Sequence, residues 1–413
     1  MSPSGKVSDE EETDVRDGRV CEERAAEVKQ RSLGVVLGLM AAALLMGVVF
    51  GFSLERGRVS LPVNIRLQFV FERWIMLKMF LAASGTSMAV FAVLDMVPAT
   101  KPAMKKCFDC FDCSKDRSIE SVLGGCFTLG IGMTLAGACP GMVLAQVGSG
   151  VPNSLVTMCG GLAGAAFYGL FEVEFTALSN KGHFIPSNCR TVHCMLGTNF
   201  SVTALAMAAA IAGGVGLLEG LVPWEKDTDQ GSAWRAEGDV WTMLAWPPSL
   251  AGIFIGLNQL PSVLLFQDSL GSSSAYQILT SLYAPFVAEK NKEPGARFHF
   301  ASKNWNGSSW WQVAYVLGAV LGGAISALAS DSFGTQEGLQ AGFAFCGGFL
   351  MLFGSRVARG CTSGHGVSGM GLLEVLSMGG AGAMFAGAII TAFIMQAAGG
   401  LNSSTTVTGA FLQ

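Results

Sequence analysis

Cys139 and Cys361 are the residues of this chain whose surroundings best suit chemistry on a small ligand. Proline or glycine flanks each of them: Pro140 and Gly141 in the first case, Gly360 and Gly364 in the second. Proline cannot continue the hydrogen-bond ladder of a helix, and glycine adopts backbone conformations that other residues resist. We therefore expect each cysteine to lie in a break between two helical segments. Such a break exposes backbone N–H groups, which attract anions.

The two motifs fall into one common register, which indicates an internal duplication. Placing Cys139 on Cys361 aligns four more pairs, namely Gly125 with Gly347, Phe127 with Phe349, Gly132 with Gly354 and Ala136 with Ala358. We expect two pseudo-symmetric membrane repeats, residues 34–222 and 249–413, the second ending in a short tail. A polar, tryptophan-rich loop at residues 223–248 joins them. Matching breaks in two halves point to the central site of a transporter, whereas the plainer alternative is a helix kink with a packed cysteine.

The elements that carry these motifs are predicted to be membrane helices. Hydrophobic residues make up 51% of the chain and charged residues 14%, whereas soluble proteins carry about 25% charged residues. Apolar runs approach the ~20 residues that cross a bilayer, and backbone groups in lipid must be satisfied within a helix. The sequence thus predicts an all-α polytopic integral membrane protein of about 9–10 transmembrane helices plus short broken half-helices. A disordered polar tail over residues 1–33 precedes them.

Several function classes are disfavoured by the sequence. The net charge of −4 is small and argues against a nucleic-acid partner. His365 lies four residues after Cys361, and a Cys–His pair can act as nucleophile and base. Nothing else in the sequence supports an enzyme, so we expect His365 to be structural. No motif indicates a cofactor.

The sequences around both cysteines resemble a known family. The stretches from Ala136 to Met142 and from Ala358 to Gly369 are similar to the two signatures of the YeeE/YedE sulfur-transport family, and the segment from Gly256 to Ser274, which contains Gln259, is similar to a third. The resemblance implies import of thiosulfate through two pseudo-symmetric halves whose cysteine loops meet near the membrane centre. It marks Cys139 and Cys361 as the thiols that the anion passes. Any sulfur-carrier partner would be a separate protein, and the plasma membrane is favoured over an organelle membrane.

Thiols suit this task because thiosulfate is a dianion with a soft terminal sulfur. A thiol is a weak hydrogen-bond donor, and permeation needs successive weak sites from which an ion can leave. We expect the thiols to stay protonated, because a thiolate would repel the anion. The expected mechanism is a hydrogen-bonded relay without covalent persulfide chemistry.

Two further polar residues are candidates for the pathway. Arg356 precedes Cys361 by five residues, and arginine within a membrane segment usually marks a pathway or a partner. We predict that it draws anions toward the motif, the alternative being that it snorkels to an interface. Ser60 stands where the family often has a third cysteine. Its hydroxyl still donates a hydrogen bond but is less polarisable than sulfur, which leaves open a pore for another small inorganic anion.

A second cysteine cluster gives an alternative from another class. Cys107, Cys110 and Cys113 follow a C-x2-C-x2-C spacing in what reads as a polar, basic loop. This spacing can bind a soft metal or form a redox couple, although a four-ligand zinc site would need a further ligand. The alternative function is therefore a membrane redox or metal sensor that uses this loop.

Overall fold

The computed structural model describes residues 32–114, 118–185, 190–227, 245–281, 310–401 and 404–405. Within these ranges seven helices are long and apolar enough to cross a membrane, or nine if each of two bent helix pairs is one span. One pair of two-residue strands, Gly338–Leu339 (β1) with Ser404–Thr405 (β2), accompanies them. The prediction of an all-α polytopic membrane protein is confirmed, and the higher count of spans meets the predicted number. The predicted N-terminal tail and most of the tryptophan-rich loop lie outside the described residues.

The helices divide into long spans and short connecting elements. The long helices are α2 (Leu33–Arg56), α4 (Ile75–Met96), α6 (Ile119–Ala136), α8 (Ser154–Leu170), α11 (Phe200–Leu221), α18 (Trp311–Ala329), α19 (Ala341–Val357) and α20 (Val375–Ala397). The short ones are α3 (Pro62–Gln68), α5 (Lys101–Ser114), α7 (Met142–Gly148), α9 (Glu172–Ser179), α10 (Val192–Met195), α12 (Trp224–Asp227) and α15 (Ser273–Ser281). A further span runs through α13 (Pro248–Leu257), α14 (Gln259–Pro261) and the π-helical η2 (Ser262–Phe266), and a second π-helical segment is η3 (Thr362–Gly369).

Both cysteine motifs lie where a helix stops and another element resumes. α6 begins after Ser118, whose hydroxyl accepts a hydrogen bond from the Ser121 N–H, and it ends at Gly137 in the left-handed conformation with φ 55°. A serine cap and a left-handed glycine are common signals for the two ends of a helix. α19 gives way to η3 with a bend of 48°. Cys139 therefore lies between α6 and α7, and Cys361 between α19 and η3.

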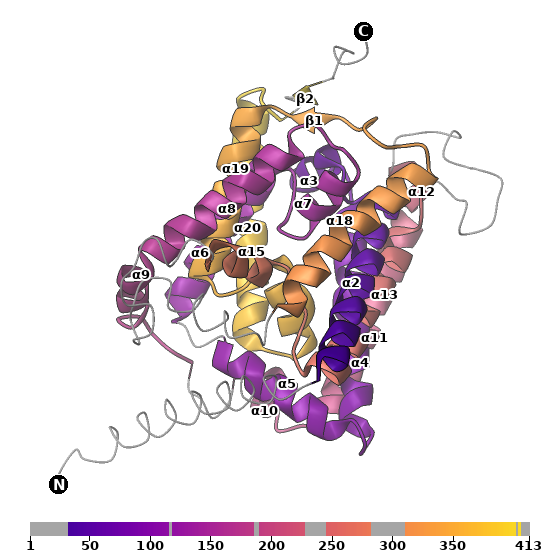
Figure 1. Ribbon diagram of the computed structural model, residues 1–413, viewed down its shortest axis with the longest axis vertical. Helices are drawn as coiled ribbons and strands as arrows, with labels where there is room; N and C mark the ends of the chain where they lie inside the picture. The colour runs from indigo at the N-terminus through magenta and orange to yellow at the C-terminus, as the bar shows by residue number, and fades with distance from the viewer. Residues whose placement is uncertain are drawn as a thin grey trace.

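The helices pack around a central crossing (Figure 1). α6 packs along both α19 and α20, and α19 packs along both α6 and α8. Farther out, α2 packs along α18 and α13 packs along α4, while α7 contacts α18 and η3 contacts α4. α15 lies near the centre and contacts α8 and α18. This arrangement places the two cysteine-bearing connections on either side of the α6–α19 crossing.

Glycine allows α6 and α19 to touch backbone against backbone. A Cβ atom on Gly125 would lie 2.5 Å from the backbone nitrogen of Ala358, and one on Gly347 would lie 2.3 Å from that of Ala136. Real Cβ atoms essentially never approach other atoms this closely, so larger residues cannot be accommodated without moving a helix. Small residues at such contacts are typical of membrane helices.

A second pair of contacts repeats this arrangement between the first two along the same helices. A Cβ atom on Gly132 would lie 2.3 Å from the backbone nitrogen of Met351, and one on Gly354 would lie 2.5 Å from that of Leu129. Each of these four glycines, Gly125, Gly132, Gly347 and Gly354, thus faces the backbone of the other chain segment at the crossing.

Substituting alanine for Gly347 tests this contact. The added methyl group meets the backbone of Ala136, so α6 and α19 must separate, and overpacking of this kind costs roughly 1–3 kcal/mol. We expect a lower melting temperature in detergent for Gly347→Ala. Gly342→Ala on the same helix is the matched control, because a Cβ atom there meets nothing within 4 Å. Equal melting temperatures for the two variants would show that the contact does not limit stability.

Candidate functional site

The Cys139 loop presents its thiol to the start of α7. The thiol lies next to the backbone N–H groups of Gly141 and Met142 and to the hydroxyl of Thr362, and its side chain is buried. The Cys139 carbonyl oxygen accepts a hydrogen bond from the Val143 N–H at 3.1 Å, which starts the following helix. The contact with Thr362 joins this loop to the one that carries the second cysteine.

The Cys361 loop surrounds its thiol with hydrogen-bonding groups. The Sγ atom lies 3.1 Å from Ser363 Oγ and 3.7 Å from Ser272 Oγ. The Ser273 hydroxyl and the Gly364 backbone N–H also interact with this thiol. Ser272 and Ser273 belong to the turn that begins α15, so an element remote in sequence completes the loop.

The two loops border one small cavity of about 40 Å³. Its lining is apolar and rich in sulfur: Phe50, Leu54, Met76, Met79, Phe80, Ala83, Cys139, Met142, Ile255, Thr362, Ser363 and Val367. Thr362 also donates to the thioether sulfurs of Met133 and Met384, at 3.6 and 3.5 Å. Thioether sulfur is polarisable and adapts to irregular shapes. The cavity can therefore accept a soft, polarisable atom beside the Cys139 thiol.

α15 connects both loops. Its Tyr276 hydroxyl donates to the carbonyl oxygen of Pro140 at 3.2 Å, and Tyr276 is buried. The Ser272 backbone N–H donates to Ser363 Oγ at 3.3 Å. None of these side chains was among the predicted site residues, although a run of three serines at residues 272–274 lies within the family-like segment.

Arg356 reaches Cys361 through intermediaries. Its guanidinium donates to Gln277 Oε1 at 2.6 Å and to the hydroxyl of Ser273, and the side chain is only 6% exposed. It therefore does not snorkel to an interface. It holds Ser273, which in turn faces the Cys361 thiol. Its predicted attraction for anions stays a prediction.

Gln259 holds η3 in place from the neighbouring span. Its amide nitrogen donates to Ser368 Oγ at 2.7 Å, and its amide oxygen accepts from the Leu270 N–H at 3.3 Å. The Ser368 hydroxyl in turn donates to the Leu270 carbonyl oxygen at 2.7 Å, so Gln259, Ser368 and Leu270 are all bonded to one another. Gln259 is fully buried, and its polar atoms fix the backbone that leads to the serine turn.

Ser60 lies behind the Cys139 loop. Its carbonyl oxygen accepts from Gln146 Nε2 at 2.8 Å, and the same nitrogen donates to the Gly137 carbonyl oxygen at 2.9 Å. The Ser60 hydroxyl is buried and makes no hydrogen bond with the described residues. Gln146 thus ties Ser60 to the end of α6, and Ser60 is not among the described residues that line the cavity.

The remaining predicted site residues shape the two breaks. Gly141 lies against Phe50, because a Cβ atom there would lie 2.9 Å from the ring. Gly360 donates its N–H to the Ser355 carbonyl oxygen at 3.0 Å, which caps α19. His365 is buried, and its ring bonds to Ser377 and to backbone rather than reaching the cavity.

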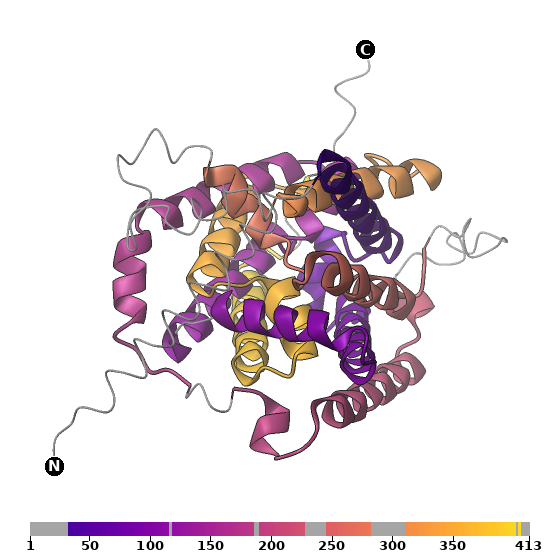
Figure 2. The same cartoon turned by 60° about the horizontal axis from the view of Figure 1, so that its bottom comes forward.

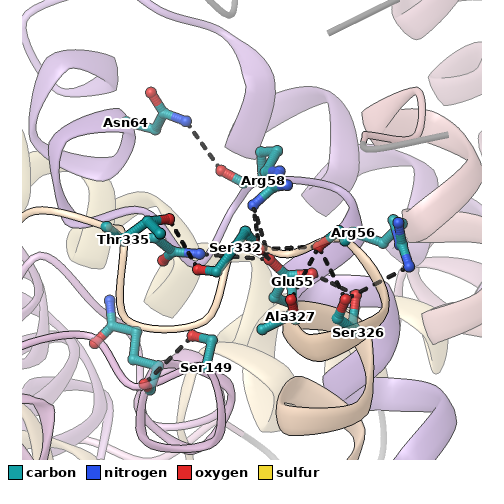
Figure 3. Close-up of polar contacts among 12 residues, drawn as sticks. Glu55, Arg56, Arg58, Asn64, Ser149, Ser326, Ala327, Ser332 and Thr335 are labelled. Atoms are coloured by element: carbon teal, nitrogen blue, oxygen red, sulfur yellow. Dashed lines mark hydrogen bonds and ion pairs between the residues drawn. The ribbon is translucent and has the colours of Figure 1, made fainter. Parts of the chain in front are cut away.

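A buried charged cluster lies at the end of α2 (Figure 3). Glu55 is fully buried and accepts from Arg58 at 2.8 Å and from the hydroxyl of Ser326. Ser332 and Gln336 also donate to this carboxylate, at 3.2 and 3.4 Å. Arg56, 1% exposed, donates to the Ser326 carbonyl oxygen at 3.5 Å. The Glu55 carboxylate therefore pairs with Arg58 and joins α2 to α18 through Ser326.

The C-x2-C-x2-C segment forms a helix, so its interpretation as a loop was wrong. α5 lies at the lower end of the bundle in Figure 1, and Figure 2 brings that end forward. Cys107 is fully buried in an apolar cluster with Met104, Phe111, Leu372 and Leu373, which explains the helix by packing. The side chains of Cys110 and Cys113 lie outside the described residues. Among those described, no group of three His, Cys, Asp or Glu side chains could hold a metal ion.

The sequence matches a family model described as Sulphur transport over residues 56–390, which include both cysteine loops. The chain belongs to the sulphur-transport family. It is similar to the thiosulfate transporter TsuA of Spirochaeta thermophila, with 23% identity over 359 residues that cover 81% of this chain and 92% of that protein. This member of the sulphur-transport family is therefore a multi-pass membrane transporter of a small sulfur-containing anion and not an enzyme. The resemblance noted in the sequence is confirmed, and the plasma membrane is a plausible location for it.

Proposed function

We propose that this transporter imports thiosulfate through the cavity between its two cysteine loops. The observation that carries the proposal is the meeting of the two motifs. Thr362, next to Cys361, contacts the Cys139 thiol, and both loops border one sulfur-rich cavity. The name of the similar thiosulfate transporter supports this choice of substrate.

The groups around the thiols match the two ends of a thiosulfate ion. Its oxygens accept hydrogen bonds from the hydroxyls of Ser272, Ser273 and Ser363 and from the Gly364 N–H, which surround Cys361. Its terminal sulfur lies against thiol and thioether groups. Donors of this kind are individually weak, so the anion passes from one to the next without being trapped. No covalent bond to Cys139 or Cys361 is needed.

The contacts between α6 and α19 support a pseudo-two-fold relation between the repeats. In a two-fold interface residue i contacts j and its equivalent j contacts the equivalent of i. With Cys139 placed on Cys361, Gly125 becomes equivalent to Gly347 and Ala136 to Ala358. The contacts Gly125–Ala358 and Gly347–Ala136 then exchange with each other. Two related loops facing across such an axis form one path from two similar halves.

Labelled uptake tests the function directly. We expect cells without their own importer to grow on thiosulfate, and to take up the labelled ion, when this protein reaches their membrane. Excess unlabelled thiosulfate should compete fully, whereas sulfate and chloride, which lack a soft terminal sulfur, should compete weakly. A well-inserted protein that takes up sulfate but not thiosulfate would favour the pore for another inorganic anion. A separate sulfur-carrier protein that accepts the imported ion stays a prediction.

A further inference from the structure

A chain of three buried polar side chains fastens the Cys361 loop to α20. The His365 ring bonds through Nδ1 to Ser377 Oγ at 2.8 Å and through Nε2 to the Ala358 carbonyl oxygen at 3.1 Å. The Ser377 hydroxyl also bonds to a carboxylate oxygen of Glu374, just before α20. The side chains of His365, Ser377 and Glu374 are 2%, 0% and 7% exposed, so bulk water is largely excluded from the chain.

The hydrogen bonds restrict where protons can lie. A carbonyl oxygen only accepts, so His365 Nε2 carries a proton in every arrangement. If Glu374 is ionised, Ser377 donates to it and His365 Nδ1 must donate to Ser377, which makes the imidazole doubly protonated and positive. If Glu374 carries the proton, it donates to Ser377, Ser377 donates to Nδ1, and both ends are neutral. The two arrangements hold the same number of protons and differ in the positions of two of them, one between Glu374 and Ser377 and one between Ser377 and His365.

The chain ends on the turn that carries the Cys361 thiol. The His365 backbone N–H donates to the Cys361 carbonyl oxygen at 2.8 Å, so the ring belongs to the same turn as the thiol. At the other end of the chain, the backbone of Glu374 forms an isolated antiparallel β-bridge with that of Thr191, on the segment that leads into α10. A charge on the ring therefore appears beside the thiol loop, while the proton comes from the far side of the turn.

We propose that Glu374, Ser377 and His365 form a proton relay that places a positive charge beneath the Cys361 loop while a dianion is bound there. This rests on the transport of thiosulfate proposed above. In the transfer, the Glu374 O–H bond breaks as a new Ser377 O–H bond forms, and the former Ser377 proton moves to His365 Nδ1. Glu374 becomes a carboxylate and His365 an imidazolium, so the net charge is unchanged. The imidazolium stabilises the dianion, and the proton returns when the anion leaves.

Other titratable groups occur on the elements packed around His365 and contribute to any pH profile. They are Glu120 and Cys126 on α6, Lys78 and Asp95 on α4, Arg356, Arg359 and Cys361 on and after α19, and Arg190 and His193 on the segment beside Glu374. Every variant below retains them, so a difference between a variant and the wild type at one pH isolates the relay.

Uptake by single and double variants is the first test. Glu374→Gln is nearly isosteric but cannot carry the mobile proton, and Ser377→Ala interrupts the chain. We expect each to lower uptake about tenfold, the ratio that ~1.4 kcal/mol of lost anion stabilisation produces. We expect wild-type uptake to fall at alkaline pH, where the relay gives up its proton, and we expect each variant to lose this fall. The double variant should be no worse than either single one, because a relay broken once is fully broken.

The contrary result is equally distinct. Additive losses with a wild-type pH profile would assign the three residues a purely structural role and overturn the relay. Thr391→Ala is the matched control, since within the part of the chain that the structure describes this hydroxyl on the same helix bonds only to the Gly387 carbonyl oxygen, at 2.8 Å. It should keep the uptake and the pH profile of the wild type.

A spectroscopic test does not depend on the substrate. The chain has four histidines, so ¹⁵N-histidine labelling gives few ring signals, and the one lost in His365→Gln identifies His365. We expect a ring protonated at Nε2 in every state, with an Nδ1 signal that changes in Ser377→Ala. A neutral ring protonated only at Nδ1 would overturn the proposal. If the wild type imports no thiosulfate, the proposed function fails, and this spectrum still decides whether the proton chain exists.

Discussion

Replacing Cys361 with alanine is expected to abolish most thiosulfate uptake while the protein still reaches the membrane. The thiol is the common partner of Ser272, Ser273 and Ser363, and alanine leaves these hydroxyls around a gap. Losing one buried hydrogen-bonding partner costs roughly 1–3 kcal/mol, which corresponds to about a tenfold to hundredfold loss of uptake. Initial rates of labelled uptake, normalised to the protein in the membrane, measure this.

Two further variants distinguish the loss of the hydrogen-bonding thiol from the loss of its volume. Cys361→Ser keeps a hydrogen-bond donor in the same place and should retain part of the uptake. The proposed passage of thiosulfate past the two loops needs a donor at this position and not a covalent bond. Cys346→Ala removes an exposed free cysteine from the helix that leads to the same loop and should transport as the wild type does. Full activity in Cys361→Ala would remove this thiol from the pathway.

Replacing Glu55 with glutamine is expected to cause the largest loss of stability. The carboxylate lies in a fully buried position between Arg58 and Ser326, and the charge on Arg56 lies nearby. Removing one partner of a buried ion pair leaves an uncompensated charge and costs roughly 3–5 kcal/mol. Thermal unfolding in detergent should show a clearly lower melting temperature for Glu55→Gln.

Two further variants test whether the buried charge accounts for the loss of stability in Glu55→Gln. Glu337→Gln changes the same residue type at an exposed position and should melt as the wild type does. Adding Arg58→Gln to Glu55→Gln removes the charge that pairs with Glu55 in the wild type and should recover part of the stability. If the double variant melts below the single one, packing rather than charge holds this end of α2.

The sequence predicted the spans well because a bilayer imposes a simple rule. An apolar run of sufficient length must become a helix, and such runs in the sequence form α11 (Phe200–Leu221) and α18 (Trp311–Ala329). Local sequence could not predict α5, because its polar composition resembles a loop. The face that buries Cys107 against Leu372 and Leu373 depends on contacts far along the chain.

The candidate site was predicted only in part, because local sequence reveals the two cysteine motifs but not the residues that pack against them. The two cysteine motifs carry their own signal in glycine and proline. The partners of Cys361 come from α15, whose serines and Tyr276 look like an ordinary polar stretch until the fold brings them to the loops. Arg356 was recognisable as a costly residue, but its contact with Gln277 depends on a helix about eighty positions away. Pairings of this kind follow from tertiary packing and not from local pattern.

The glycine contacts between α6 and α19 have a mechanical consequence. Most helix pairs meet through side chains, which can change rotamer and let one helix slide on the other. At Gly125 and Gly347 no such adjustable layer separates the two backbones, so the crossing has little slack. α6 and α19 are therefore poorly suited to rocking against each other about this crossing. In the proposed pathway, the short loops at Cys139 and Cys361 therefore move to let the anion pass, while the α6–α19 crossing stays rigid.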